Sequence, residues 1–314
     1  MRTKTKLSHA SRPAGRLLRS AIFAVAVVGA LLAGLAPASA ATAQAVQTRP
    51  GTGHFLMSSA AARQIRKSGH APAPVVTDRG GDRSKAGLTP PPMSSAMIRA
   101  NAAKQRLAKS FLARHRPGVI PCCGGGGSEP NDLNIAGSQQ AQQTSYWCGP
   151  ATAAEALKAF NVSKTQSQMA TSLGTTTNGT DWSDSGGYPT VNTMDAYEST
   201  NGYVAVALPA NPTSSQITTF EDDDVTDVYG VGAPLLGDAY ETYNGPHLVG
   251  HPNQATPIYH WFDIRGYEDK GVDTDYEDSV HGASSISWSS GVPAYSTLAS
   301  STIVQILGGR GYDW

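Results

Sequence analysis

The segment QQTSYWCGP, residues 142–150, leads directly into the alanine-rich stretch ATAAEALKAF, which ends at Phe160. Proline fits well in the first turn of a helix, so Pro150 places a helix start at Cys148. The apolar residues after it recur at helical spacing. The sequence therefore predicts a helix over 148–160 that has a cysteine at its N-terminus.

A cysteine at a helix N-terminus is well placed for nucleophilic chemistry, because the helix dipole stabilises a thiolate there. A thiolate is the nucleophile that acyl transfer requires. Gln142 lies six residues upstream of Cys148. Its side-chain amide could fold back so that it forms an oxyanion hole with the backbone N–H of Cys148. The alternative is that Cys148 is a small buried hydrophobic residue.

The best candidate for the base is His260, which stands in the stretch TPIYHWFDIRGY at 256–267. This stretch predicts a strand, and its inward face would carry Ile258, His260, Phe262 and Ile264. A histidine in such a position is more often a core residue than a catalytic one. Here the inward position favours catalysis, because a base must be held rigidly.

His247 and His251 lie in a loop that contains glycine, proline and asparagine, and we expect both side chains to face solvent. The alternative is that both line a substrate cleft, and His247 is a candidate substrate contact there. Trp147 and Trp261, which neighbour Cys148 and His260 in the sequence, are the other candidate substrate contacts.

An aspartate could orient the base and stabilise its charged form. Asp278 follows His260 by eighteen residues, at the end of the next predicted strand. A hairpin would return Asp278 to the side of His260. Asp263 is a weaker candidate, because it falls on the opposite face of its strand.

Residues 1–40 have the pattern of an export signal. Basic residues are followed by an apolar stretch from Ala21 to Leu35 and by the small-residue site Ala38-Ser39-Ala40. The apolar stretch is shorter than the roughly twenty residues of a membrane span. We expect cleavage after Ala40, secretion of the mature chain and no membrane attachment afterwards. An uncleaved signal anchor is the alternative.

The rest of the chain divides into two parts of opposite charge. Residues 41–127 contain thirteen Lys and Arg against two Asp, whereas residues 128–314 contain five Lys and Arg against twenty-two acidic residues. Opposite charges attract within about 10 Å at physiological salt. We therefore predict a basic pro-segment that lies on an acidic body. The alternative is that the basic part contacts the cell envelope.

Within the pro-segment, the composition up to about residue 95 indicates disorder. Residues 96–115 predict a basic amphipathic helix, and the run Gly124 to Gly127 predicts a flexible linker. Cys122 and Cys123 precede that linker. Cys148 is the single cysteine of the body, so it is either a free thiol or bonded to one of this pair.

Residues 128–314 are enough for one compact domain. Besides the helix at 148–160, helices are predicted at 165–173, 190–198 and 215–229. Strands are predicted at 203–208, 233–240, 257–266 and 276–280. Helices come early and strands late, which favours an α+β fold with N-terminal helices packed on an antiparallel sheet.

Acidic clusters occur at 221–227 and 273–277. Calcium accepts carboxylate oxygens, but the spacing does not match an EF-hand, so we expect a solvated acidic face and no metal site. No pattern for phosphate or nucleic-acid binding is present, and we expect a monomer without a cofactor.

In sum, a Gln precedes Cys-Gly-Pro at a helix start, a strand His is followed by Gly-Tyr-Glu-Asp, and an Asp follows the next strand. This order resembles the papain-like double-glycine leader peptidases, which include the bacteriocin-processing enzymes. The resemblance covers roughly residues 138–300. It implies a papain-like fold, with Gln142 at the oxyanion hole, Cys148 as nucleophile, His260 as base and Asp278 as orienting residue. Well-known members are fused to membrane transporters with an ATPase, and Ser279 stands where the family has a proline after its aspartate.

The function that we expect is therefore that of a stand-alone, secreted, bacterial-type cysteine peptidase made as a zymogen. Its partners would be a peptide or protein substrate and its own basic pro-segment. Two alternatives remain open. One is a cell-wall peptidoglycan amidase or endopeptidase with a similar Cys–His pair, and the other is a non-catalytic binding module on a peptidase fold.

Overall fold

The structure is a computed structural model, and it describes residues 85, 91–116 and 128–314. The predicted signal peptide at 1–40, Cys122, Cys123 and the linker Gly124 to Gly127 lie outside the described residues. No described helix has both the length and the apolarity that crossing a membrane would require.

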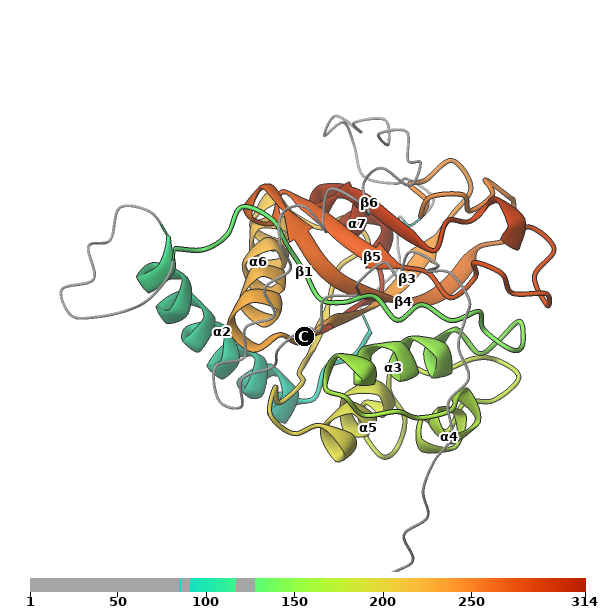
Figure 1. Cartoon of the computed structure of the whole chain (residues 1–314), viewed down its shortest axis with the longest axis horizontal. Helices are drawn as coiled ribbons and strands as arrows, with labels where there is room; N and C mark the ends of the chain where they lie inside the picture. The colour runs from blue at the N-terminus through green and yellow to red at the C-terminus, as the bar shows by residue number, and fades with distance from the viewer. Residues whose placement is uncertain (1–84, 86–90, 117–127) are drawn as a thin grey trace, which may run out of the picture. The chain divides into compact units, whose positions relative to one another are not determined.

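The centre of the fold is a seven-stranded sheet with the order β2-β7-β3-β4-β5-β6, and β1 pairs with β4 (Figure 1). All of these pairs are antiparallel. The strands are β1 (Leu133–Asn134), β2 (Ala205–Ala207), β3 (Leu235–Glu241), β4 (Ile258–Glu268), β5 (Asp273–Glu277), β6 (Tyr295–Ala299) and β7 (Gly311–Asp313).

Helices pack on the sheet from both sides. The helices are α2 (Ser95–His115), α3 (Cys148–Ala159), α4 (Gln166–Ser172), α5 (Pro189–Tyr197), α6 (Ser214–Val225) and α7 (Ser300–Leu307). One apolar core joins α3, α4 and α5 to the sheet, and a second core joins α2, α6 and α7 to it (Figure 1). The sheet therefore separates two cores, and its central strand β4 is buried along nearly its whole length.

The predicted α+β class and antiparallel sheet are confirmed, and the predicted helices and strands all occur within a few residues of their expected bounds. The single inward face predicted for 257–266 is wrong, because Trp261 lies in the core with α3 while Phe262 and Ile264 lie in the other core. Within that strand, only Tyr259 is exposed. The helix predicted at 215–229 is α6, which continues as a π-helix over Thr226–Val231.

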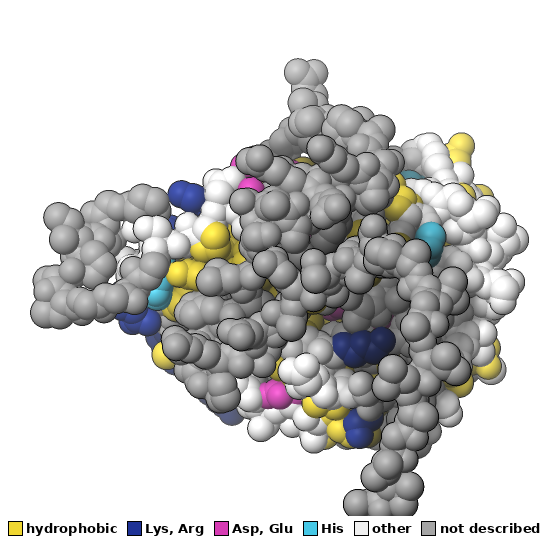
Figure 2. All heavy atoms as spheres, in the orientation of Figure 1, with side chains coloured by type: hydrophobic (Ala, Val, Ile, Leu, Met, Phe, Trp, Pro, Cys, Tyr) yellow, Lys and Arg dark blue, Asp and Glu magenta, His cyan; other side chains and the backbone are white. Residues whose placement is uncertain are grey.

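The basic helix predicted at 96–115 is observed as α2, and it packs against α6. Lys104 Nζ lies 2.9 Å from Asp227 Oδ2 and 4.5 Å from the centre of the Trp314 ring. Ala108 and Leu112 are buried on the same side of α2. Lys and Arg side chains are also visible along the outer side of this helix (Figure 2). The α2 helix thus contributes both charge and apolar surface to the described part of the chain.

The solvated face predicted for the acidic clusters at 221–227 and 273–277 is wrong. In the second cluster, Asp275 and Glu277 are buried. Asp223, Asp224 and Asp227 are at most 1% exposed. Asp223 accepts hydrogen bonds from Tyr312 and from Gln105 of α2, while Asp227 pairs with Lys104. Burial raises the pKa of Asp224 well above its ordinary value, and neighbouring carboxyl groups raise it further. The acids of the first cluster are therefore part of the interior beneath α2.

Candidate active site

The site begins at the N-terminus of α3, where Cys148 is the first helical residue. The hydroxyl group of Thr152, one turn later, donates to the carbonyl oxygen of Trp261 at 2.9 Å and so fixes the first turns of α3 against β4. Cys148 is 8% exposed and free of any disulfide. Since His260 directly precedes Trp261 on β4, this attachment places the thiol beside the imidazole, within hydrogen-bonding reach.

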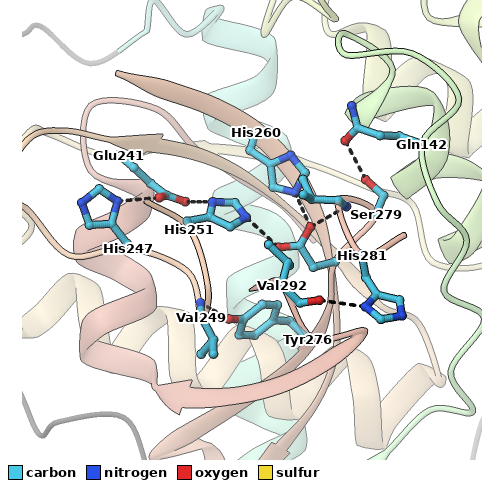
Figure 3. A network of polar contacts seen from close by, with 12 residues as sticks. Gln142, Glu241, His247, Val249, His251, His260, Tyr276, Ser279, His281 and Val292 are labelled. Carbon is cyan, nitrogen blue, oxygen red and sulfur yellow. Dashed lines mark hydrogen bonds and ion pairs between the residues drawn. The ribbon is translucent and has the colours of Figure 1, made fainter. Parts of the chain in front are cut away.

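Asp278 lies beside His260 because β4 and β5 form an antiparallel hairpin and Asp278 directly follows β5. Nε2 of His260 lies 2.9 Å from Oδ1 of Asp278 (Figure 3). The backbone N–H of Val280 donates to the same oxygen at 2.8 Å. The hairpin that the sequence predicts therefore brings this aspartate to the predicted histidine.

This hydrogen bond determines the role of each ring nitrogen of His260. A carboxylate only accepts, so Nε2 carries a proton and donates it to Asp278. The nitrogen left to face the Cys148 thiol is Nδ1. Burial lowers the pKa of His260, but Asp278 and Cys148 outweigh burial and raise that pKa well above its ordinary value. The geometry thus favours an imidazolium that contacts the sulfur on one side and a carboxylate on the other.

The polar contacts continue beyond Asp278 to residues that the sequence placed in solvent (Figure 3). Nε2 of His251 lies 2.9 Å from Oδ2 of Asp278, and its Nδ1 lies 2.8 Å from Oε1 of Glu241. The other oxygen of Glu241 lies 2.7 Å from Nδ1 of His247. The prediction that His247 and His251 face solvent is wrong, because their side chains are 14% and 0% exposed.

The charges in this chain of contacts alternate. Burial opposes ionisation of Asp278, but His260 and His251 together lower the pKa of Asp278 far below its usual range. Burial likewise opposes protonation of His251, but Glu241 and Asp278 raise the pKa of His251 to about 9. The pKa of Glu241 is lowered in spite of its burial, mainly by His251 and then by His247. Each buried charge is therefore next to one of opposite sign.

His251, His260 and Asp278 also place ligand-type atoms within 4.8 Å of one another. Each histidine directs a nitrogen at its own oxygen of Asp278 from 2.9 Å, which is an ordinary hydrogen-bond distance. A metal ion would have to displace both hydrogen bonds. The arrangement therefore favours a chain of hydrogen bonds over a metal site. We call this chain, which consists of His260, Asp278, His251, Glu241 and His247, the relay.

Gln142 is buried, and it is hydrogen-bonded to Ser279, the residue that follows Asp278. Its backbone N–H donates to the carbonyl oxygen of Ser279 at 2.8 Å, and its Oε1 accepts from the Ser279 hydroxyl group at 3.3 Å. Its Nε2 donates to the carbonyl oxygen of Thr144 at 2.7 Å. A side-chain amide has two N–H groups, so one remains for a further acceptor.

The tryptophans that the sequence proposed as substrate contacts differ in their surroundings. Trp147 is partly exposed directly before Cys148. Trp261 is 2% exposed, stacks on Trp182 and donates its indole N–H to the carbonyl oxygen of Thr180 at 3.2 Å. Trp261 is therefore a core residue that supports the site and offers substrate almost no surface, which corrects its assignment as a substrate contact.

Asp263, the weaker candidate for orienting His260, lies in a different cluster. It is opposite Glu277 on β5, and both are buried near Glu155 of α3. Burial, and then Glu277, raise the pKa of Asp263 well above its ordinary value. Glu277 accepts hydrogen bonds from Ser138, and Glu155 accepts one from the backbone N–H of Gln140. Glu277 and Glu155 therefore hold the segment 138–140, which leads to Gln142.

Gly149 leaves no space for a side chain beside the nucleophile. A Cβ at this position would lie 2.3 Å from Oγ1 and 2.7 Å from Cβ of Thr180. We predict that Gly149→Ala lowers the free energy of unfolding by about 1–3 kcal/mol. It should also reduce kcat/KM about 10²-fold, because the start of α3 must shift and carry Cys148 with it.

Urea unfolding and peptide hydrolysis would measure both effects. The matched control is the double variant Gly149→Ala/Thr180→Gly, which removes the clash and should recover most of both losses relative to Thr180→Gly alone. A Gly149→Ala variant as stable and active as the wild type would contradict the predicted clash.

The sequence did not identify His251 and Glu241 as part of the site. Their only signal is that two histidines, His247 and His251, stand four residues apart shortly after a strand that ends in an acid. The loop composition around them indicates exposure, and their burial depends on contact with Asp278, which comes from another segment.

Comparison with known proteins bears on this site. The sequence profile of the Peptidase_C39 like family matches residues 133–292, which include all of the residues in the relay. No curated protein sequence matches significantly.

Two solved structures are similar in part. One is a putative C39-like peptidase from Bacillus anthracis, at 12% identity and a TM-score of 0.34, covering 59% of this chain and 96% of that chain. The other is the digestive procathepsin L 3 of the Tenebrio molitor larval midgut, at 12% identity and a TM-score of 0.35, covering 70% of this chain and 87% of that chain. The profile match spans half of the sequence, and on that basis the chain belongs to the Peptidase_C39 like family.

Proposed function

We propose that the protein is a cysteine peptidase of papain-like fold that hydrolyses peptide bonds through Cys148, His260 and Asp278. The observation that carries this proposal is the hydrogen bond from His260 Nε2 to Asp278 Oδ1, which leaves Nδ1 for the thiol. The family membership supports the same activity.

In this mechanism, the Cys148 thiolate attacks the carbonyl carbon of the scissile bond, and the oxygen becomes an oxyanion. The backbone N–H of Cys148 and the remaining N–H of Gln142 would bind that oxyanion. Nδ1 of His260 then donates its proton to the leaving amine, the C–N bond breaks and a thioester remains. Nδ1 next takes a proton from water, whose oxygen attacks the thioester and releases the acid and the thiolate.

The substrate would bind beside the nucleophile, where Trp147 is partly exposed. His247 contacts Glu241 and is mostly buried, so we assign it to the relay in place of its predicted contact with substrate. Of the three substrate contacts that the sequence proposed, Trp147 is therefore the one with exposed surface for a peptide.

We further propose that the protein is secreted and made as a zymogen, as a monomer. Secretion is supported by the signal-like pattern of residues 1–40. The zymogen is supported by contacts of the basic segment with the body. Lys85 Nζ donates to three carbonyl groups at the end of α7, and Pro91 and Pro92 line a cavity of about 350 Å³ together with residues of the body, Trp182, Tyr240 and Tyr259 among them.

Selective alkylation tests the activity. At pH 5.5 an ordinary thiol is protonated and reacts slowly, whereas a thiolate paired with an imidazolium reacts fast. We predict that iodoacetamide modifies Cys148 at least about 10²-fold faster than Cys122 and Cys123 of the same reduced chain. Loss of peptide hydrolysis should follow the modification of Cys148. Peptide mapping by mass spectrometry would assign the rates.

Three results would separate the candidate functions. Fast modification of Cys148 in parallel with loss of peptide hydrolysis supports the peptidase. Fast modification with cleavage of peptidoglycan, and none of peptides, would support the cell-wall amidase. A Cys148 that reacts no faster than the other two cysteines would exclude a thiol enzyme and favour a binding module.

A further inference from the structure

Asp278 contacts a second histidine in addition to His260. One oxygen of Asp278 accepts from His260, and the other faces Nε2 of His251 at 2.9 Å (Figure 3). His251 in turn lies 2.8 Å from Glu241, at the end of β3. The side chains of His251 and Glu241 are 0% exposed. His251 is as close to Asp278 as the proposed base is, and the mechanism above uses neither His251 nor Glu241.

The contacts of His251, together with the lowered pKa values of Glu241 and Asp278, determine its charge. Both of its ring nitrogens face carboxylate oxygens, which only accept hydrogen bonds. A neutral imidazole has a single N–H, so one of the two contacts would then bring a lone pair against an oxygen. Both contacts are favourable only when both nitrogens are protonated. His251 is therefore a buried cation between two buried anions.

We infer that His251, held as an imidazolium by Glu241, is a positioning residue that fixes the Asp278 carboxylate and limits how tightly that carboxylate holds His260 in its protonated form. The inference rests on the proposed cysteine peptidase function. It adds two residues to the proposed triad, so that the working unit is the chain Cys148–His260–Asp278–His251–Glu241.

The electrostatic effect follows from the distances. The ring centres of His251 and His260 are 5.3 Å apart, and like charges at this distance repel each other. His251 also shares Asp278 with His260, so it neutralises part of the charge that stabilises the His260 imidazolium. Both effects make it easier for His260 to release its proton. A general acid works best when it does not hold its proton far too tightly.

The groups around His251 come from several elements. Glu241 is on β3, His260 is on β4 and Asp278 follows β5, while His247 reaches His251 only through Glu241. The Trp288 ring is a further neighbour, and its centre lies 4.7 Å from that of His251. The titratable groups that contact His251 are thus two acids and one further histidine.

The first test is the variant His251→Gln, which keeps a donor for Asp278 and removes the charge. The kcat/KM of peptide hydrolysis would be measured from pH 4 to pH 11. On the alkaline limb of this profile, kcat/KM falls because His260 loses the proton that it must donate to the leaving amine. In His251→Gln we expect this alkaline limb to move up by about one pH unit, because His260 holds its proton more tightly. We also expect kcat to fall about 10-fold with KM nearly unchanged.

Two further variants complete the design. His251→Gln leaves Glu241 buried with only His247 as a partner, so it could fail to fold. The double variant His251→Gln/Glu241→Gln removes the cation and its counter-ion together and should still raise the alkaline limb, by a smaller amount. His281→Gln is the matched control. This histidine bonds to the Val292 carbonyl oxygen at 2.7 Å and does not contact the Asp278 side chain, so its replacement should leave the alkaline limb in place.

Stability provides a readout that does not depend on catalysis. The pKa of His251 is raised from 6.5 to about 9. Its charged form therefore stabilises the fold fully below about pH 6.5, and this contribution is lost as the pH rises through about 9. Urea unfolding from pH 6 to pH 10 should show this loss in the wild type. The double variant should lose less stability over the same range.

The outcomes are distinguishable. An alkaline limb that moves up in the folded His251 variants, but not in His281→Gln, supports the inference. An unmoved limb in a folded variant whose Cys148 still reacts fast would overturn the inference and leave the proposed peptidase intact. A wild-type Cys148 that iodoacetamide modifies at pH 5.5 no faster than Cys122 and Cys123 would overturn both.

Discussion

Replacement of Asp278 by alanine is expected to reduce kcat/KM about 10³–10⁴-fold, whereas replacement by asparagine should cost only about 10-fold. Alanine removes the acceptor for Nε2 of His260, so the imidazole loses its orientation and the stabilisation of its charged form. It also leaves His251 and His260 facing each other without the carboxylate between them. Peptide hydrolysis measures the loss, and circular dichroism checks the fold.

Asparagine should be tolerated because the backbone fixes the orientation of its amide. The N–H of Val280 donates to the position of Oδ1 and therefore requires an acceptor there. The amide oxygen then takes this position and still accepts from His260. The amide nitrogen faces His251, which can lose one proton and accept. An asparagine variant as inactive as the alanine variant would show that the charge of Asp278, and not its acceptor position, is what catalysis needs.

Local patterns in the sequence predicted two parts of the site. The Cys-Gly-Pro segment predicted the start of α3, and the structure begins that helix at Cys148. Two strands separated by a short turn predicted the hairpin that returns Asp278 to His260, and these two residues are hydrogen-bonded. In both cases the information lies within one segment or in two adjacent strands.

What the sequence missed depends on contacts between distant segments. His251 lies in a polar loop and becomes buried because Glu241 and Asp278 bind its two nitrogens. The acidic run at 221–227 looks like a solvated surface, and it becomes interior because α2 covers it. Composition predicts that such polar residues are exposed. Only the tertiary fold provides the partners that allow their burial.

The most destabilising change that we predict is in α2, outside the active site. We expect Lys104→Met to lower the free energy of unfolding by about 3–5 kcal/mol, because it leaves Asp227 buried without its counter-ion. Lys104 Nζ lies 2.9 Å from both Asp227 Oδ2 and Asn201 Oδ1, and the Asp227 side chain is 0% exposed. Burial raises the pKa of Asp227, and Lys104 opposes that rise. Without Lys104, the aspartate must take up a proton or draw water into the core.

Urea unfolding at pH 7 measures this effect, and two variants control for it. Lys109→Met changes an exposed lysine of the same helix and should alter stability by less than about 0.5 kcal/mol. Lys104→Met/Asp227→Asn removes both charges and should be more stable than Lys104→Met alone. If Lys104→Met unfolds like Lys109→Met, α2 does not hold the body together through this ion pair. A large loss would show that α2 stabilises the described body through the Lys104–Asp227 ion pair.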